Sequence, residues 1–387
     1  MEARDRSRAL GSWARVSSLG ALCVFAACGG SNGGGADFGS NTGPSSSSGS
    51  GSGGGDDASS GGSGGASSSG SASGGSSASG AGGSSSGSTS GSSGGHVDAG
   101  HDASGGSSSG SSGGGTGTKP TLLPTAMGTC PTLATGNSVG ISLNGKSMPW
   151  TLYVGSKASS PTGPIIIYWH GTGTSGSADV GWGIGQAAIS SVMALGGVVA
   201  AAESTSSTGT NTGDGVWYTG DVDWADFIIA CAIQQLNIDT RHIHASGYSA
   251  GALQTGYMYY ARSGYLASVV VYSGGAGIGA GTFQDPTNVA PLIGAHGAPG
   301  GTGCTLTSTN CDLLAGSTTM FEQAAKAAGA PIVVDCNDGG AHTDITRLTR
   351  LAPSTWQFFK DHPFKQGKPD PYAGGLPAGF PTYCAIQ

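Results

Sequence analysis

A serine stands at the centre of the stretch whose residue types and spacing indicate covalent catalysis. The run Ile-His-Ala-Ser-Gly-Tyr-Ser-Ala-Gly begins at Ile243 and contains the pattern Gly-x-Ser-x-Gly from Gly247 to Gly251. An apolar segment precedes this pattern, and a helical pattern follows it through Tyr260. A strand, a sharp turn and a helix with serine at the apex form a nucleophile elbow. Gly and Ser dominate the composition, so a chance match is the alternative, but the flanking elements favour Ser249 as a nucleophile.

A serine hydroxyl is a weak nucleophile at neutral pH and needs an adjacent general base. In folds with this elbow, the partners follow along the chain in the order Ser, acid, His. His342 fits this order, because it follows an expected strand over 331–335 and a loop at the carboxyl end of that strand would return it to Ser249. His170 and His296 each precede a glycine at a strand end, so we expect them to shape loops.

Two backbone N–H groups should stabilise the oxyanion that forms when the serine attacks a carbonyl. One belongs to Ala250, directly after the nucleophile. The other is expected in the loop after an apolar strand at 164–169, which reads His-Gly-Thr-Gly-Thr and has the form of the partner motif. We select Thr172 as this second donor. The alternative is a glycine turn that only reverses the chain.

The elements around these residues alternate between strands and helices, which indicates a mostly parallel, doubly wound α/β sheet with helices on both faces. The segment 164–169 is a continuous apolar run, typical of a strand buried on both sides. Residues 119–364 are enough for one stable domain. The expected strands are 150–154, 164–169, 198–202, the elbow strand, 267–272, 289–295 and 331–335, and the expected helices are 223–236, the segment after Ser249, 317–328 and 353–360.

The chain resembles a known family at the motifs HGTG, GYSAG and GGAH and at Ile-Asp-Thr-Arg over 238–241. It is similar there, over roughly residues 145–362, to secreted esterases of the poly(3-hydroxybutyrate) depolymerase and feruloyl esterase group. The resemblance implies an α/β-hydrolase fold and ester hydrolysis through an acyl-enzyme, with Ser249 as nucleophile and His342 as base. It further implies a polyester or an acylated plant polysaccharide as substrate.

The acid of the triad departs from the pattern of that group. There it follows, by a few residues, a His-Gly pair that ends the penultimate strand, whereas the pair at 296–297 is followed here by Ala-Pro-Gly-Gly. Asp312 is the first acid afterwards, and a loop closed by Cys304 and Cys311 would deliver it to the usual place. Asp285, after the preceding strand, is the alternative. The missing acid also motivates a second hypothesis, a catalytically inactive α/β-hydrolase domain that serves as a surface binding module.

The N-terminus has the pattern of an export signal. An arginine-rich start leads into an apolar run from Val16 to Ala27 that is too short to span a bilayer. Residues 1–28 end in a sequence that resembles the box preceding the lipidated cysteine of bacterial lipoproteins, so we expect a lipid on Cys28. An ordinary secretory signal is the alternative. Residues 29–118 are almost entirely Gly and Ser, which predicts a disordered linker. The protein is expected to leave the cytoplasm and to be lipid-anchored or secreted.

Six cysteines remain after the signal region, which fits disulfides in an exported chain. Cys304 and Cys311 close a short loop and are the expected pair. Cys130 and Cys384 lie at the two ends of the domain, where one or both should fix a terminus. The tail 365–387 is rich in Pro and Gly.

Charge is sparse, with 15 Lys and Arg against 22 Asp and Glu and a net charge of −7. This acidic balance, without a basic cluster, argues against nucleic acid or an anionic membrane surface as a partner. The sequence contains no Cys-x-x-Cys, and no further ligand set supports the His-x-His at 242–244, so we predict neither a metal nor a cofactor. We expect a monomer that acts on an ester substrate and contacts membranes only through its lipid.

Overall fold

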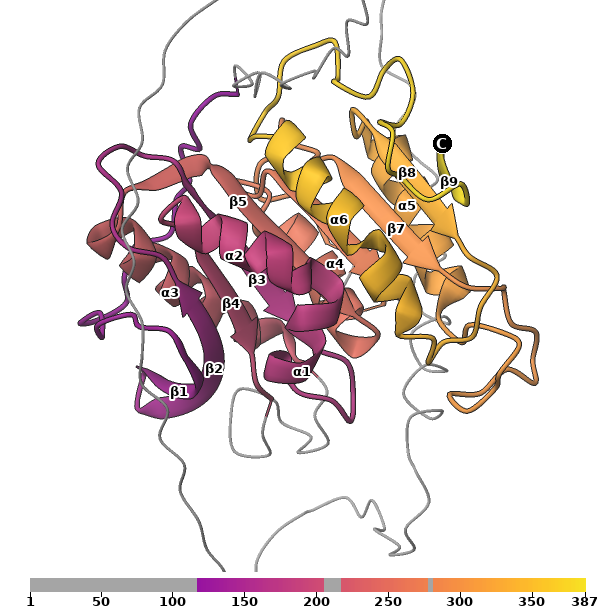
Figure 1. Ribbon diagram of the computed structural model, residues 1–387, viewed down its shortest axis with the longest axis horizontal. Helices are drawn as coiled ribbons and strands as arrows, with labels where there is room; N and C mark the ends of the chain where they lie inside the picture. Colours follow the sequence, from indigo (N-terminus) through magenta and orange to yellow (C-terminus); the bar gives the residue numbers. More distant parts are fainter. Residues whose placement is uncertain (1–116, 205–216, 278–280) are drawn as a thin grey trace, which may run out of the picture. The chain divides into compact units, whose positions relative to one another are not determined.

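The computed structural model describes residues 117–204, 217–277 and 281–387, and the predicted signal peptide and nearly all of the predicted linker lie outside these ranges. The described residues form a nine-stranded sheet in the order β1-β2-β4-β3-β5-β6-β7-β8-β9 (Figure 1). The six strands from β4 to β8 in this order are parallel, and β1, β2 and β9 are antiparallel at the two edges. The strands are β1 (Gly136–Leu143), β2 (Lys146–Val154), β3 (Gly163–Trp169), β4 (Val198–Ala202), β5 (Ile238–Tyr248), β6 (Ser268–Tyr272), β7 (Leu292–His296), β8 (Val333–Asn337) and β9 (Cys384–Ile386).

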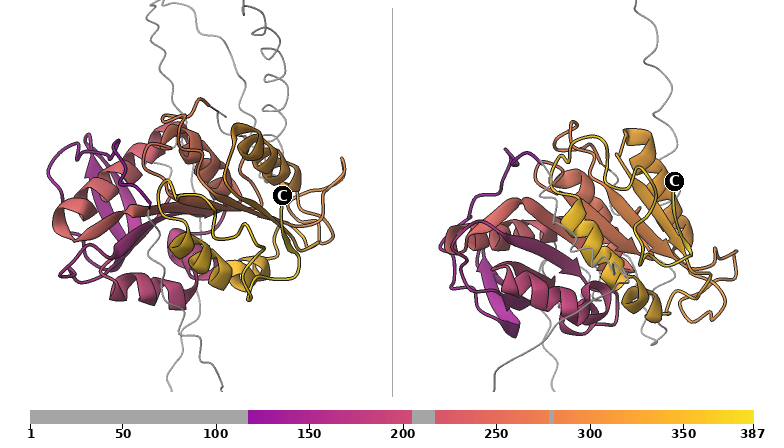
Figure 2. Two further views of the ribbon diagram at one scale, coloured as in Figure 1. Left: turned by 90° about the horizontal axis from the view of Figure 1, so that it is seen from above. Right: turned by 45° about the horizontal axis from the view of Figure 1, so that its top comes forward.

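Helices cover both faces of the sheet, as the edge-on view in Figure 2 shows. One core lies between the sheet and helices α3, α4 and α5, and the other lies between the sheet and helices α2 and α6. The α-helices are α1 (Gly176–Val180), α2 (Gln186–Ala194), α3 (Val222–Gln235), α4 (Ala250–Ala261), α5 (Ala315–Ala328) and α6 (Thr346–Asp361).

The central strands supply both cores because successive side chains of a strand point to opposite faces. In β3, Ile165, Ile167 and Trp169 enter the first core, whereas Ile166 and Tyr168 enter the second. All seven residues of β3 are buried. The predicted parallel α/β sheet with helices on both faces is therefore confirmed.

Several elements differ from the sequence-based expectation. The first is the β1–β2 hairpin, of which only the second strand was expected, and then only over 150–154. Its turn is Asn144-Gly145, with φ of +52° and +75°, and such a turn matches the twist of a hairpin. The second is α6, which begins at Thr346 and contains Pro353. Proline lacks the N–H that would donate to the carbonyl of Thr349, four residues earlier. Both Pro353 and Thr349 are exposed, so water can donate to that carbonyl instead.

Strand β7 also differs, since it begins at Leu292, whereas the sequence predicted a start at 289. The carbonyl of Pro291, just before the strand, still accepts a hydrogen bond from Val269 N–H (3.1 Å). The ladder between β6 and β7 pairs residues only from Leu292 onward. The strand is therefore shorter than the apolar run because pairing with β6, not hydrophobicity, sets its start.

Three disulfides join the described cysteines. The predicted pair Cys304–Cys311 is present. Cys130 joins Cys231 on α3. Cys336 on β8 joins Cys384 on β9, and these two strands also pair in the sheet. The tail 365–387 therefore completes the sheet. No described helix has the length and apolar character that crossing a membrane requires.

Candidate active site

The sharp turn between β5 and α4 forces Ser249 into a conformation that side chains rarely adopt, with φ of +55° and ψ of −119°. The turn is possible because the residues on either side of it are small. A Cβ atom on Gly247 would overlap the carbonyl oxygen of Gly251, and one on Gly251 would overlap the carbonyl oxygen of Trp169 on β3. The two glycines of the motif thus allow strand and helix to pack in contact, with the serine at the apex.

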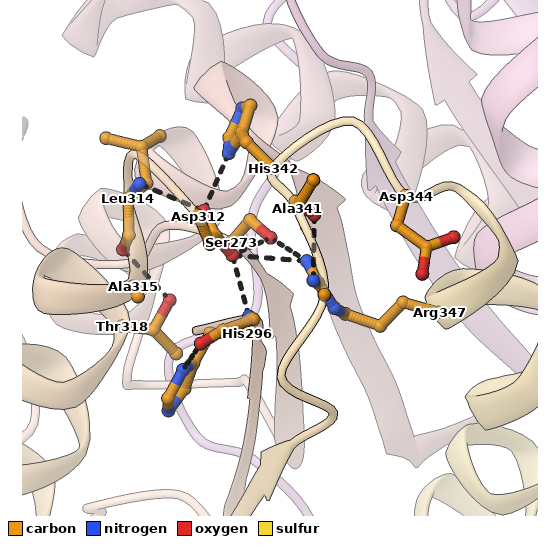
Figure 3. A network of polar contacts seen from close by, with 12 residues as sticks. Ser273, His296, Asp312, Leu314, Ala315, Thr318, Ala341, His342, Asp344 and Arg347 are labelled. Atoms are coloured by element: carbon orange, nitrogen blue, oxygen red, sulfur yellow. Dashed lines mark hydrogen bonds and ion pairs between the residues drawn. The ribbon is translucent and has the colours of Figure 1, made fainter. Parts of the chain in front are cut away.

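Ser249, His342 and Asp312 form a continuous hydrogen-bonded chain. The Ser249 Oγ lies 2.9 Å from His342 Nε2. His342 Nδ1 in turn lies 2.8 Å from Asp312 Oδ1, as Figure 3 shows. The exposed fractions of the three residues are 8%, 1% and 0%, so water has little access to the two inner groups. The three residues named from the sequence are therefore brought together, each within hydrogen-bonding distance of the next.

Asp312 is held by a dense set of donors. Its Oδ1 also accepts from Leu314 N–H (3.0 Å), and its Oδ2 accepts from Gly297 N–H (2.9 Å), Ser273 Oγ (2.7 Å) and Arg347 Nη1 (3.1 Å). Burial alone would raise the pKa of Asp312. The hydrogen bond and charge of His342, with the hydrogen bonds from Gly297 and Ser273, outweigh burial and hold this pKa well below its usual range. The carboxylate is therefore charged at neutral pH.

The loop closed by Cys304 and Cys311 ends directly at Asp312. Asp312 N–H donates to Ala298 O (2.7 Å), and the carbonyl of Cys311 accepts from His342 N–H (3.1 Å). The loop is thus bonded both to the segment after β7 and to the histidine itself.

The alternative acid, Asp285, is not part of this chain. Its carboxylate bonds instead to Thr287 and to Lys365 Nζ (2.9 Å). The structure therefore places Asp312, and not Asp285, beside His342.

Arg347 and Ser273 belong to this site, although the sequence analysis did not single them out. Arg347 is fully buried on α6 and also donates through Nη2 to Asp338 Oδ1 (3.0 Å) and to the carbonyl of Ala341 (2.9 Å). It therefore joins the acid to the loop that carries His342 (Figure 3). The sequence signal was an arginine five residues after His342, but the helix that buries it was expected to begin only at 353.

The predicted oxyanion loop lies directly against the nucleophile. A Cβ atom added to Gly171 would stand 2.8 Å from the Tyr248 ring and 3.3 Å from Ser249 Cβ. The N–H of Gly171 is taken by Asp179 Oδ2 (3.0 Å). Within the described part of the chain, the N–H groups of Thr172 and Ala250 donate to no protein atom. Both groups are thus free for a ligand near Ser249.

The other histidines have structural partners. His170 Nδ1 lies 2.7 Å from Gly171 O, and its Nε2 accepts from Ser204 N–H (3.0 Å), so it shapes the loop before Thr172. His244 Nδ1 bonds to Ser268 Oγ (2.9 Å), and its ring stacks on Phe359. Neither histidine contacts Ser249.

The sheet order, the elbow after β5 and the helices on both faces make this an α/β-hydrolase fold. No protein-family model matches the sequence, and no curated protein matches it.

Several solved structures are similar in overall arrangement. Native pOPH is 16% identical, with a TM-score of 0.48 over 67% of this chain and 96% of that one. A thermostable esterase is 14% identical, with a TM-score of 0.43 over 58% and 63%. An S-formylglutathione hydrolase from Agrobacterium tumefaciens is 14% identical, with a TM-score of 0.40 over 59% and 94%.

Proposed function

We propose that this protein is a serine hydrolase that cleaves carboxylic esters through an acyl-enzyme. The observation that carries this proposal is the chain from Ser249 Oγ through His342 to the buried Asp312, with contacts of 2.9 and 2.8 Å. Such an arrangement on a strained elbow gives a hydroxyl the base that it needs at neutral pH.

In the proposed reaction, His342 Nε2 takes the proton of Ser249 Oγ while this oxygen attacks the ester carbonyl. The oxyanion that results accepts hydrogen bonds from the N–H groups of Thr172 and Ala250. Collapse of the intermediate breaks the bond to the alkoxy oxygen, and His342 returns the proton to the departing alcohol. Water, activated by the same nitrogen, then releases the carboxylic acid and restores Ser249.

Asp312 has two roles in this scheme. Its Oδ1 accepts a hydrogen bond from the Nδ1–H of His342, which keeps Nε2 unprotonated and facing the serine, and its charge stabilises the imidazolium that forms. The inactive binding module was motivated by a missing acid. Because Asp312 contacts His342, the acid is not missing, and we do not propose an inactive binding module.

The test is the Ser249→Ala variant, assayed with p-nitrophenyl acetate and with a fluorophosphonate probe. We expect turnover to fall by about 10⁴-fold or more, because the nucleophile is lost while the rest of the site remains. Labelling by the probe should also vanish. The control is Ser190→Ala, at an exposed serine on α2, which should change neither measurement. Near-normal turnover of Ser249→Ala would show that another group is the nucleophile.

The finer proposal is that the ester belongs to a polymer, either a polyester or an acylated polysaccharide. It rests on the family resemblance of the motifs HGTG, GYSAG and GGAH. Soluble product released from a poly(3-hydroxybutyrate) film or from feruloylated arabinoxylan would distinguish the two polymers.

We further propose that the protein is exported and anchored through a lipid on Cys28. The three disulfides support export, because such bonds persist in oxidising compartments.

A further inference from the structure

A second group of titratable side chains lies outside the Ser249 site, where α5 packs on β7 and β8. His296 ends β7, Asp335 lies on β8 and Glu322 lies on α5. Each offers one atom that can ligate a metal, and the three atoms lie within 4.8 Å of one another. Among the described residues, no other group of three such side chains comes this close together.

Glu322 is the unusual member of this group. It is 4% exposed, and its Oε1 accepts no hydrogen bond in the described part of the chain. Gly294, in the middle of β7, makes room for it, because a Cβ atom there would overlap Glu322 Oε1. Glycine weakens a strand interior and often marks the close approach of another group. The strand therefore forgoes a side chain at the position where a buried carboxyl group faces it.

The ring of His296 is oriented as in a metal site. Its Nδ1 lies 2.7 Å from the carbonyl oxygen of Gly297, which can only accept, so Nδ1 carries a proton. In the neutral ring, Nε2 then presents a lone pair to Asp335 Oδ1, 3.1 Å away. Two lone pairs at this distance need a proton or a cation between them. Histidines that bind metals typically donate their other N–H to such a carbonyl.

We propose that His296, Glu322 and Asp335 bind one divalent transition-metal cation, for which Zn²⁺ is the best match, in a structural site between α5, β7 and β8. One imidazole nitrogen and two carboxylate oxygens form a donor set that suits this ion. Ligands about 2.1 Å from a tetrahedral zinc ion lie roughly 3.4 Å apart, near the 3.1 Å between His296 Nε2 and Asp335 Oδ1. The Asp335 side chain is 26% exposed, so water can supply the fourth ligand.

The cation would hold the segment that leads into the Asp312 network. His296 is followed by Gly297, whose N–H donates to Asp312 Oδ2 (2.9 Å), and the carbonyl of His296 accepts from Asp338 N–H (3.0 Å). Figure 3 shows His296 directly beside this network.

The experiment measures zinc bound by the full-length protein after treatment with EDTA and dialysis, by calorimetric titration with ZnCl₂ and by elemental analysis. Glu322→Gln should bind one equivalent fewer than the wild type, so ions held elsewhere on the chain cancel in the difference. The control is Asp370→Asn, which disrupts a buried His–Asp contact to His362 (3.4 Å) that has no third ligand among the described residues. It should bind as much zinc as the wild type.

Thermal unfolding gives a second readout. Zinc at ~100-fold above its Kd should raise the Tm of the wild type by about 5 to 10 °C and leave that of Glu322→Gln unchanged. In EDTA, Glu322→Gln should melt close to the wild type, since an amide has nearly the shape of a carboxyl group. If Glu322→Gln does not fold, His296→Gln supplies the same comparison. Equal zinc uptake and equal Tm shifts in the wild type and these variants would overturn the proposal.

Discussion

At the scale of single residues, Asp312 is the group on which the proposed mechanism depends most. We expect Asp312→Asn to lower kcat/KM by about 10⁴-fold near neutral pH, because an amide no longer fixes the tautomer of His342. The loss should shrink at high pH, where deprotonation bypasses the wrong tautomer. The measurement is the pH profile of p-nitrophenyl acetate hydrolysis. The control is Asp285→Asn, because the carboxylate of Asp285 forms hydrogen bonds only outside the site. This variant should leave kcat/KM nearly unchanged.

The same variant should change how stability depends on pH. The pKa of Asp312 lies below that of an unfolded aspartate, so its charged form stabilises the fold above the unfolded pKa of about 3.9 and this contribution is lost as pH falls through the folded value. The difference in unfolding free energy between wild type and Asp312→Asn should therefore shrink on acidification below about pH 4. A difference that stays constant from pH 7 to pH 3 would contradict the assigned environment of Asp312.

At the scale of elements, the loop closed by Cys304 and Cys311 presents the acid. Replacing both cysteines by serine should lower kcat several-fold, because Cys311 precedes Asp312 and its carbonyl holds the His342 N–H. The loss of stability should be modest, about 2.5 kcal/mol for so short a loop. Replacing Cys336 and Cys384, which close a longer loop, should remove about 4 kcal/mol and affect kcat less.

Chemical denaturation and steady-state kinetics of the two double variants separate these effects. If the variant that lacks Cys304 and Cys311 keeps full activity, hydrogen bonds alone position Asp312, and the disulfide serves only stability.

The sequence was sufficient for the elements whose local pattern and tertiary environment agree. The continuous apolar run of β3 and the glycine-flanked elbow at Ser249 are examples, since burial on both faces and close packing leave a clear pattern. For the acid, the resemblance and the cysteine pair favoured Asp312 but left Asp285 open as the alternative. Arg347 could not be found in this way, because its burial depends on partners from three separate segments, the carboxylates of Asp312 and Asp338 and the hydroxyl of Ser273. Its helix, α6, was expected to begin only at Pro353, because proline usually stands in the first turn of a helix. Here Pro353 lies inside the helix on its exposed side.

At the scale of the whole molecule, the first described residue, Gly117, already packs on the domain, two residues before the predicted boundary. Gly117 is buried, and a Cβ atom there would stand 2.7 Å from the carbonyl oxygen of Phe364. We therefore expect deletion of residues 29–116 to leave the Tm and kcat of the purified protein unchanged, because that stretch has little apolar surface to pack. Differential scanning calorimetry checks the first and the ester assay the second. A fall of several degrees would show that the segment contributes to the fold.

The pattern of disulfides has a consequence for how the chain matures. The six bonded cysteines pair consecutively along the chain, the first with the second, the third with the fourth and the fifth with the sixth. The pairs are Cys130–Cys231, Cys304–Cys311 and Cys336–Cys384. A chain that crosses a membrane from its N-terminus exposes its thiols in this same order, so an oxidase that joins each newly arrived thiol to its predecessor yields the native set. If the protein is exported as proposed, its biogenesis therefore requires an oxidase but no isomerase, and the Cys336–Cys384 bond forms last of the three.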